Sequence, residues 1–124
     1  MVNLLARADT LVVEGNNNVR VHRAMICRQG DVTPRTSSHQ RHFCGECGAH
    51  LWAFNDEWPK LIHPVAASVD TPLPKPPSVT HIFLGSKPDW LSVEIGPDDK
   101  AFDRYPDQSI EEWHKRHEMY EGSN

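Results

Sequence analysis

Apolar and polar positions alternate over short stretches of the chain, which favours β-strands over long helices. Residues 19–26 alternate apolar with polar side chains, and residues 10–14 are rich in β-branched types. A Gly-Asn-Asn-Asn run separates the two stretches. This pattern predicts a β-hairpin over residues 10–26. Residues 30–40 contain little apolar material, so we expect a surface loop there.

Two further hairpins are expected later in the chain. The stretches 50–54 and 61–65 have the composition of strands and flank a turn sequence. Residues 79–84 and 90–95 repeat this pattern around a second turn. The segment 71–77 holds four prolines, which favours an extended connector over the alternative of a docking motif for proline-binding modules.

A helix is predicted near the C-terminus. Ser109 and Glu112 have the spacing of a capping box, in which each side chain accepts a backbone N–H of the other residue. Ile110, Trp113 and His117 then fall on one helical face, which we expect to pack against the sheet. The chain is therefore expected to form a mainly β fold with a short C-terminal helix, as a single domain over residues 1–124.

Composition narrows the classes of partner. The net charge of −4 and the pI near 6.0 argue against a surface that binds nucleic-acid phosphates or acidic lipids. No stretch reaches the roughly 20 apolar residues of a membrane span, and the first residues lack a full signal-peptide core. We therefore expect a soluble protein of the cytoplasm, with no nucleic-acid or membrane partner. Its three cysteines fit a secreted disulfide framework poorly.

The sequence Cys44-Gly45-Glu46-Cys47-Gly48 has the form of a zinc knuckle. Two thiolates separated by two residues grip one metal ion from a tight turn, and the following glycine permits the backbone that such a turn needs. A redox dithiol is the less favoured alternative, because strand-like residues rather than a helix follow the pair. Two unligated thiols are a third interpretation.

Zinc takes four ligands, so Cys44 and Cys47 predict half of a structural site. Candidates for completing it within the chain are Cys27, His39, His42 and His50, and none has a convincing spacing. Cys27 ends an alternating stretch, so we expect it to be a small buried hydrophobic residue.

Residues 41–52 resemble the last cysteine motif of the glutathione-dependent formaldehyde-activating enzyme family, which also includes the centromere protein V domain. They are Arg41-His42-Phe43-Cys44-Gly45-Glu46-Cys47-Gly48-Ala49-His50-Leu51-Trp52. The resemblance continues through His-Pro-Val-Ala-Ala-Ser-Val-Asp-Thr-Pro at 63–72, Lys-Pro-Asp-Trp at 87–90, Phe102 and Tyr-Pro-Asp at 105–107. It covers residues 10–117 best.

The resemblance implies a small zinc-associated β-sheet domain of the formaldehyde-activating type. It also implies a carbon–sulfur lyase chemistry that joins formaldehyde to glutathione as S-hydroxymethylglutathione, and hence a small thiol adduct such as glutathione–formaldehyde as partner. In that family a C-x-C pair joins the later C-x-x-C around a structural zinc, and a C-x-C-x-x-C cluster holds the zinc proposed to be catalytic.

This sequence contains neither of the two earlier family motifs. We expect Met1 to lie after the point where they would stand, which makes the chain an N-terminally shortened member of the family. Cys44 and Cys47 carry over as structural-metal ligands, and no residue carries over as catalytic. His63, Asp70 and Trp90 lie in family-like blocks; we expect a packed strand residue, a turn residue and a core residue, with substrate contact as the alternative.

Three functions follow for this chain. It is a carbon–sulfur lyase of the family with a shortened N-terminus, or a catalytically silent zinc-dependent binding module. In the second case two copies would pool their Cys44 and Cys47 pairs as a homodimer that shares zinc. A thiol–disulfide redox protein is the third and least favoured.

Overall fold

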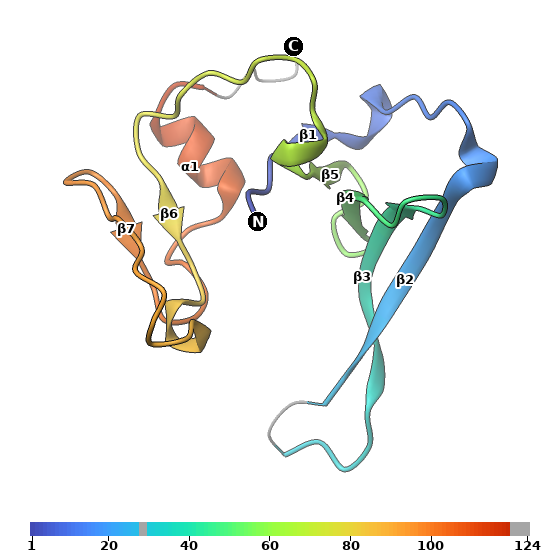
Figure 1. Ribbon diagram of the computed structural model, residues 1–124, viewed down its shortest axis with the longest axis horizontal. Coiled ribbons are helices and arrows are strands. Elements are labelled where there is room, and N and C mark those ends of the chain that lie inside the picture. Colours follow the sequence, from blue (N-terminus) through green and yellow to red (C-terminus); the bar gives the residue numbers. More distant parts are fainter. Residues whose placement is uncertain (28–29, 120–124) are drawn as a thin grey trace. The chain divides into compact units, whose positions relative to one another are not determined.

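The fold is described by a computed structural model in which residues 1–27 and 30–119 are placed (Figure 1). The chain divides into two compact units, of which the first is Met1–Leu73 and the second begins at Pro74. The prediction of one domain over residues 1–124 is not tested by this division and stays a prediction. The expected mainly β fold is confirmed, with a single short α-helix near the C-terminal end of the described residues.

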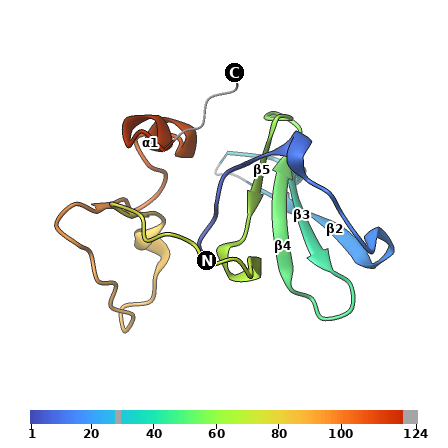
Figure 2. The same ribbon diagram turned by 90° about the horizontal axis from the view of Figure 1, so that it is seen from above.

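The first unit is built on a five-stranded antiparallel sheet with the order β1-β5-β4-β3-β2. Figure 2 shows the four longer strands side by side. The strands are β1 (Ala6–Arg7), β2 (Val19–Ile26), β3 (Arg35–Cys44), β4 (His50–Asn55) and β5 (Leu61–Pro64). The sheet therefore places β3 between β2 and β4, and β3 ends at the first cysteine of the knuckle.

The predicted hairpin over residues 10–26 is wrong. β2 pairs with β3, with Val19 opposite Cys44, and residues 8–10 form the 3₁₀ turn η1 (Ala8–Thr10). The loop expected over residues 30–40 is wrong in its second half, because β3 begins at Arg35. The polar composition of β3 misled the prediction. Backbone pairing with β2, joined by pairing with β4 from His39 onward, satisfies its backbone groups, and this context outweighs the weak strand preference of single residues.

The predicted hairpin of residues 50–54 and 61–65 is confirmed. β4 and β5 run antiparallel, with Trp52 opposite Pro64 and Phe54 opposite Ile62. This hairpin also supplies much of the buried apolar surface of the first unit, since Ala53, Ile62 and Val65 are its most buried hydrophobic residues. The 3₁₀ turn η3 (Ala66–Ser68) follows directly. Pairing between these neighbouring strands and burial of their apolar side chains favour the same structure, so the sequence pattern alone predicts this hairpin.

The third predicted hairpin is wrong. In the second unit, β6 (Thr80–His81) pairs in parallel with β7 (Lys100–Ala101), and residues 90–95 form no strand. Phe83 adopts a left-handed backbone with φ of 59°, which ends the extended segment just before the 3₁₀ turn η4 (Leu84–Ser86). Trp90, expected in the core, is 83% exposed.

A carboxylate ties together the two chain segments that carry β6 and β7. Asp99 accepts the backbone N–H of Val79 at 2.7 Å and that of Gly96 at 2.8 Å, and it lies 3.3 Å from His81 Nε2. The N–H groups of Val79 and Gly96, followed by His81, lower the pKa of Asp99 because they favour its charged form. The short parallel pair is thus supported by a side chain as well as by its ladder.

The helix α1 (Ile110–Arg116) begins where the sequence predicts. Ser109 Oγ accepts the Glu112 N–H at 3.1 Å, and Glu112 Oε2 accepts the Ser109 N–H at 2.6 Å. Trp113 stacks on His117 with ring centroids 4.2 Å apart, and His117 Nε2 lies 3.4 Å from Ser78 Oγ. The capping box is confirmed, whereas packing of this helix on the five-stranded sheet stays a prediction.

None of the helices in the described part of the chain has the length and apolar character that a membrane crossing requires.

Candidate metal centre

The cysteine pair lies in the turn between β3 and β4. Cys44 is the last residue of β3, and its N–H donates to the Ala49 carbonyl at 2.9 Å. The Gly48 N–H donates to the Cys44 carbonyl at 2.8 Å and closes the turn. The pair therefore stands between two strands, and not between a strand and a helix as a thioredoxin-like dithiol would.

Two glycines make this turn possible for different reasons. Gly48 has a φ of 77°, a left-handed conformation that strains other L-residues. Gly45 is needed for space, because a Cβ there would lie 3.0 Å from the Asn18 carbonyl oxygen and 3.1 Å from Arg20 Cγ. The Gly45 N–H also donates to that Asn18 carbonyl at 2.7 Å, so the residue just before β2 supports the knuckle from outside.

The local backbone favours a thiolate at Cys44. The N–H groups of Cys47 and Glu46 donate toward the Cys44 sulfur, and they lower the pKa of its thiol, with a further hydrogen bond from the Cys47 side chain. Hydrogen bonds to sulfur stabilise the charged form, which is the form that binds metal. Cys44 is partly exposed and Cys47 is exposed. The turn thus presents two accessible sulfurs, with thiolate-favouring amides around the first.

The two thiols fit zinc in type but not in number. Zinc prefers thiolate and imidazole ligands in a set of four. No cluster of three or more His, Cys, Asp or Glu side chains able to hold a metal ion is found within residues 1–27 and 30–119. A site built on this turn therefore needs ligands beyond those that the described residues bring together.

Cys27 is not the buried hydrophobic residue that the sequence predicts. It is exposed just after β2, and its sulfur lies 3.9 Å from the Asp31 carbonyl oxygen. β2 ends at Ile26, so Cys27 lies beyond the ladder that would have covered it. In the antiparallel register, Val19 of β2 pairs with Cys44 while Ile26 pairs with Arg35, which puts Cys27 past the end of β2 far from the knuckle.

Two histidines flank the knuckle and carry unpaired ring nitrogens. His42 stacks on Trp52 with centroids 4.7 Å apart and an interplanar angle of 13°. The His42 Nδ1 and His50 Nε2 atoms are buried, and neither has a hydrogen-bond partner among the residues that the structure describes. Burial, followed by the neighbouring His50, lowers the pKa of His42 and favours its neutral ring.

A second group of polar side chains lies on one face of the sheet. The register puts Arg41, Ala53 and His63 directly across from one another, and it puts His39 on the same face two residues away. Burial is the largest cause that lowers the pKa of His39. The neighbouring charge of Arg41 lowers it further, and that of His63 does so to a smaller extent. Burial also lowers the pKa of His63. Sequence reasoning missed Arg41, since only the register of three strands shows which residues share its face.

The other candidates are placed as follows. His63 is half-buried on β5, as expected for a packed strand residue. Asp70 is exposed in the coil after η3, and Trp90 belongs to the second unit. Substrate contact by any of the three stays a prediction.

The two knuckle glycines generate a test of this geometry. Gly48→Ala is expected to destabilise the metal-free chain by about 1–2 kcal/mol, because the left-handed backbone strains an alanine. No atom lies within 4 Å of an added Cβ, so crowding does not contribute. Gly48→Asn is expected to be milder, since asparagine tolerates this conformation. Urea midpoints of the three proteins measure the effect, and equal midpoints would rule out the strained turn.

Comparison with known proteins adds the ancestry of the chain. No family model matches it, and no solved structure matches it. A Halomonas elongata protein with the provisional name glutathione-dependent formaldehyde-activating enzyme is 42% identical over 121 residues, which are 98% of this chain and 73% of that protein. The chain belongs to the glutathione-dependent formaldehyde-activating enzyme family.

Proposed function

We propose that this chain is a zinc-binding member of its family in which Cys44 and Cys47 supply two thiolates to a structural zinc ion. The observation that carries the proposal is the turn itself: two accessible sulfurs at the end of β3, with the N–H groups of Glu46 and Cys47 directed at the first of them. This arrangement favours thiolate and leaves both sulfurs free to bind a soft divalent metal.

The remaining ligands would come from a second copy of the chain. Two knuckles together offer four thiolates, the set that a closed tetrahedral zinc site takes. Both sulfurs are accessible to a partner, whereas Cys27 lies at the other end of the β2–β3 pair. Zinc bound in this way would link two copies, and folding of the β3–β4 turn would gain stability from metal and dimerisation together.

The proposed site is structural and not catalytic. A zinc ion held by four thiolates has no open position for water or substrate, whereas catalytic zinc keeps one. The related Halomonas protein is named for glutathione and formaldehyde. We extend to this chain the same class of ligand, a small thiol adduct such as glutathione–formaldehyde, but not turnover, because the sequence has no C-x-C-x-x-C cluster.

Zinc content tests the shared site. The full chain, purified after growth with zinc and without chelators, is expected to contain one zinc ion per two chains and to run as a dimer in light scattering. Cys44→Ser and Cys47→Ser should each lose the metal and shift the protein toward monomer, because two ligands of one site are removed per dimer. Elemental analysis by mass spectrometry gives the stoichiometry.

Cys27→Ser is the matched control, since it removes the remaining cysteine while the knuckle stays intact. It should retain zinc and the dimer. A folded, metal-free monomer in the wild-type preparation would contradict the proposal. Loss of zinc in the Cys27 variant would show that the ligands of the metal are not those proposed.

The prediction that the chain does not catalyse this reaction has its own test. The zinc-loaded chain is expected to leave the formation of S-hydroxymethylglutathione from formaldehyde and glutathione at its spontaneous rate, followed by NMR. The reason is that a four-thiolate site offers no coordination position to either reactant. A rate that rises in proportion to protein concentration would contradict this part of the proposal.

A further inference from the structure

A serine and a histidine from distant parts of the chain meet inside the second unit. Ser78 Oγ lies 3.4 Å from His117 Nε2, and both side chains are half-buried. Ser78 stands in the coil just before β6, whereas His117 follows the last residue of α1. A hydroxyl beside an imidazole is the pairing that nucleophilic catalysis by serine requires, and such pairs are often looser before substrate binds. The two side chains are therefore a candidate nucleophile and base.

His117 is held in the orientation that a general base needs. Its Nδ1 lies 2.8 Å from the Trp113 carbonyl oxygen, and its ring stacks on the Trp113 indole with centroids 4.2 Å apart. A carbonyl oxygen can only accept a hydrogen bond, so in the neutral ring Nδ1 carries the proton and Nε2 carries a lone pair. The Ser78 hydroxyl is then the donor to Nε2, which is the direction in which a base removes its proton.

The backbone on both sides of Ser78 is restrained as well. Pro77 comes directly before it, and the pyrrolidine ring fixes the φ angle of that residue. Val79 comes directly after it, and the Val79 N–H donates to Asp99 at 2.7 Å. Asp99 also accepts the Gly96 N–H at 2.8 Å, which ties this segment to the one opposite. The hydroxyl is thus positioned before any substrate arrives, and less of the reaction barrier goes into orienting it.

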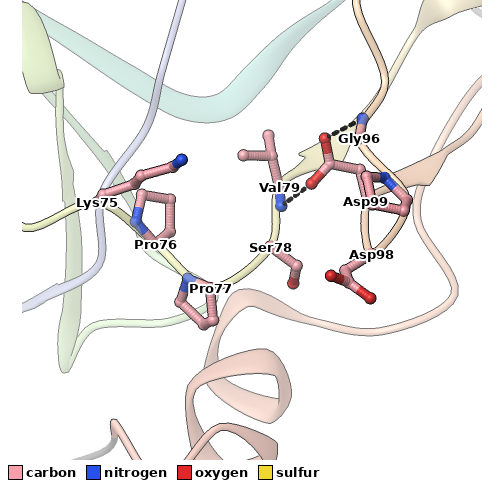
Figure 3. Close-up of a pocket in the computed structure, with 9 residues that line it drawn as sticks. Lys75, Pro76, Pro77, Ser78, Val79, Gly96, Asp98 and Asp99 are labelled. Carbon is pink, nitrogen blue, oxygen red and sulfur yellow. Dashed lines mark hydrogen bonds between the residues drawn. The ribbon is translucent and has the colours of Figure 1, made fainter.

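A cavity beside Ser78 gives room for a substrate. Its volume is about 300 Å³, near the lower end of the range for small-molecule sites. Figure 3 shows Ser78 in its lining together with Pro76, Pro77 and Val79, opposite the segment 96–99. The proline rings and the valine side chain offer apolar contacts next to the hydroxyl. A short acyl chain fits such a lining.

We propose that Ser78 and His117 form an acyl-transfer site that hydrolyses short-chain carboxylic esters. His117 Nε2 takes the hydroxyl proton while Ser78 Oγ bonds to the carbonyl carbon of the ester. The bond from that carbon to the leaving oxygen then breaks, and the proton on Nε2 passes to this oxygen to give the alcohol. A water molecule that gives a proton to Nε2 attacks the acyl-serine, releases the carboxylic acid and restores both side chains.

The Ser78 N–H is the group available to stabilise the oxyanion. It donates to no other residue in the part of the chain that the structure describes. The backbone N–H of the nucleophile is one of the two oxyanion donors in serine proteases. One donor stabilises the developing charge less than two, so we expect slow turnover and a preference for activated esters.

The experiment uses p-nitrophenyl acetate, an activated ester with a coloured leaving group, and the full chain. Peptide mapping by mass spectrometry is expected to find an acetyl group on Ser78, and Ser78→Ala should lack it. His117→Gln should slow acetylation of Ser78 by about tenfold or more, because it removes the base. This factor is smaller than the roughly 10²–10⁴-fold of well-aligned bases, since the Oγ–Nε2 separation is long.

Two matched controls come from the same unit. His114 Nδ1 contacts the Ile110 carbonyl at 2.7 Å, one helical turn back, as His117 Nδ1 contacts that of Trp113. His114→Gln therefore removes a similar imidazole from the same helix without touching the pair, and Ser86→Ala removes an exposed hydroxyl. Both variants should acetylate Ser78 at the wild-type rate. They correct for the reaction of this ester with any exposed histidine.

Three results overturn the proposal: no acetyl group on Ser78 of the wild type, no slowing in His117→Gln, or equal slowing in His114→Gln and His117→Gln. The first needs no variant, and amide spectra of ¹⁵N-labelled variants report whether each keeps its fold. Since the readout is acetylation at Ser78, failure here leaves the zinc proposal for Cys44 and Cys47 standing, and failure of the zinc proposal leaves this one standing.

Discussion

The pairing of β3 on both of its edges is the constraint on which the first unit depends. β3 is a polar strand that contacts β2 over most of its length and β4 near its C-terminal end. These two ladders satisfy the backbone groups that a polar segment would otherwise leave to water. Because Val19 pairs with Cys44, the ladder runs to the first residue of the knuckle. The sheet thereby fixes where the two sulfurs stand.

This placement connects the fold to the chemistry of the cysteines. The turn after β3 is short, closes through Gly48 and Ala49, and directs two N–H groups at the Cys44 sulfur. Its support from Asn18 comes from the residues just before β2. A bound zinc ion would therefore brace the end of a three-strand arrangement and not an isolated loop, and its binding free energy would add to the stability of β2, β3 and β4 together.

For this protein, membership of the family does not by itself establish catalytic activity. The identity to the Halomonas protein establishes descent over 98% of the chain. Turnover depends on particular ligands, and the sequence offers three cysteines, of which two stand in the knuckle and one is remote from it.

Sequence reasoning succeeded where the determining interactions are local. The β4–β5 hairpin and the Ser109 capping box each depend on residues within about one turn or hairpin of each other. It failed for β2 and β6. Each of these strands pairs with a segment, β3 or β7, that lies farther away along the chain than the nearest strand-like stretch, which the prediction chose instead. The parallel β6–β7 pair, supported by Asp99, has no signature in hydrophobic periodicity, and Trp90 was assigned to a core by residue type alone.

The central claim is that the Cys44 and Cys47 sulfurs bind zinc, and X-ray absorption at the zinc edge measures this directly. For the purified full chain, the account predicts a single shell of sulfur at about 2.3 Å. A shell made only of nitrogen and oxygen at about 2.0–2.2 Å would contradict it, since the metal would then be held by residues other than the knuckle.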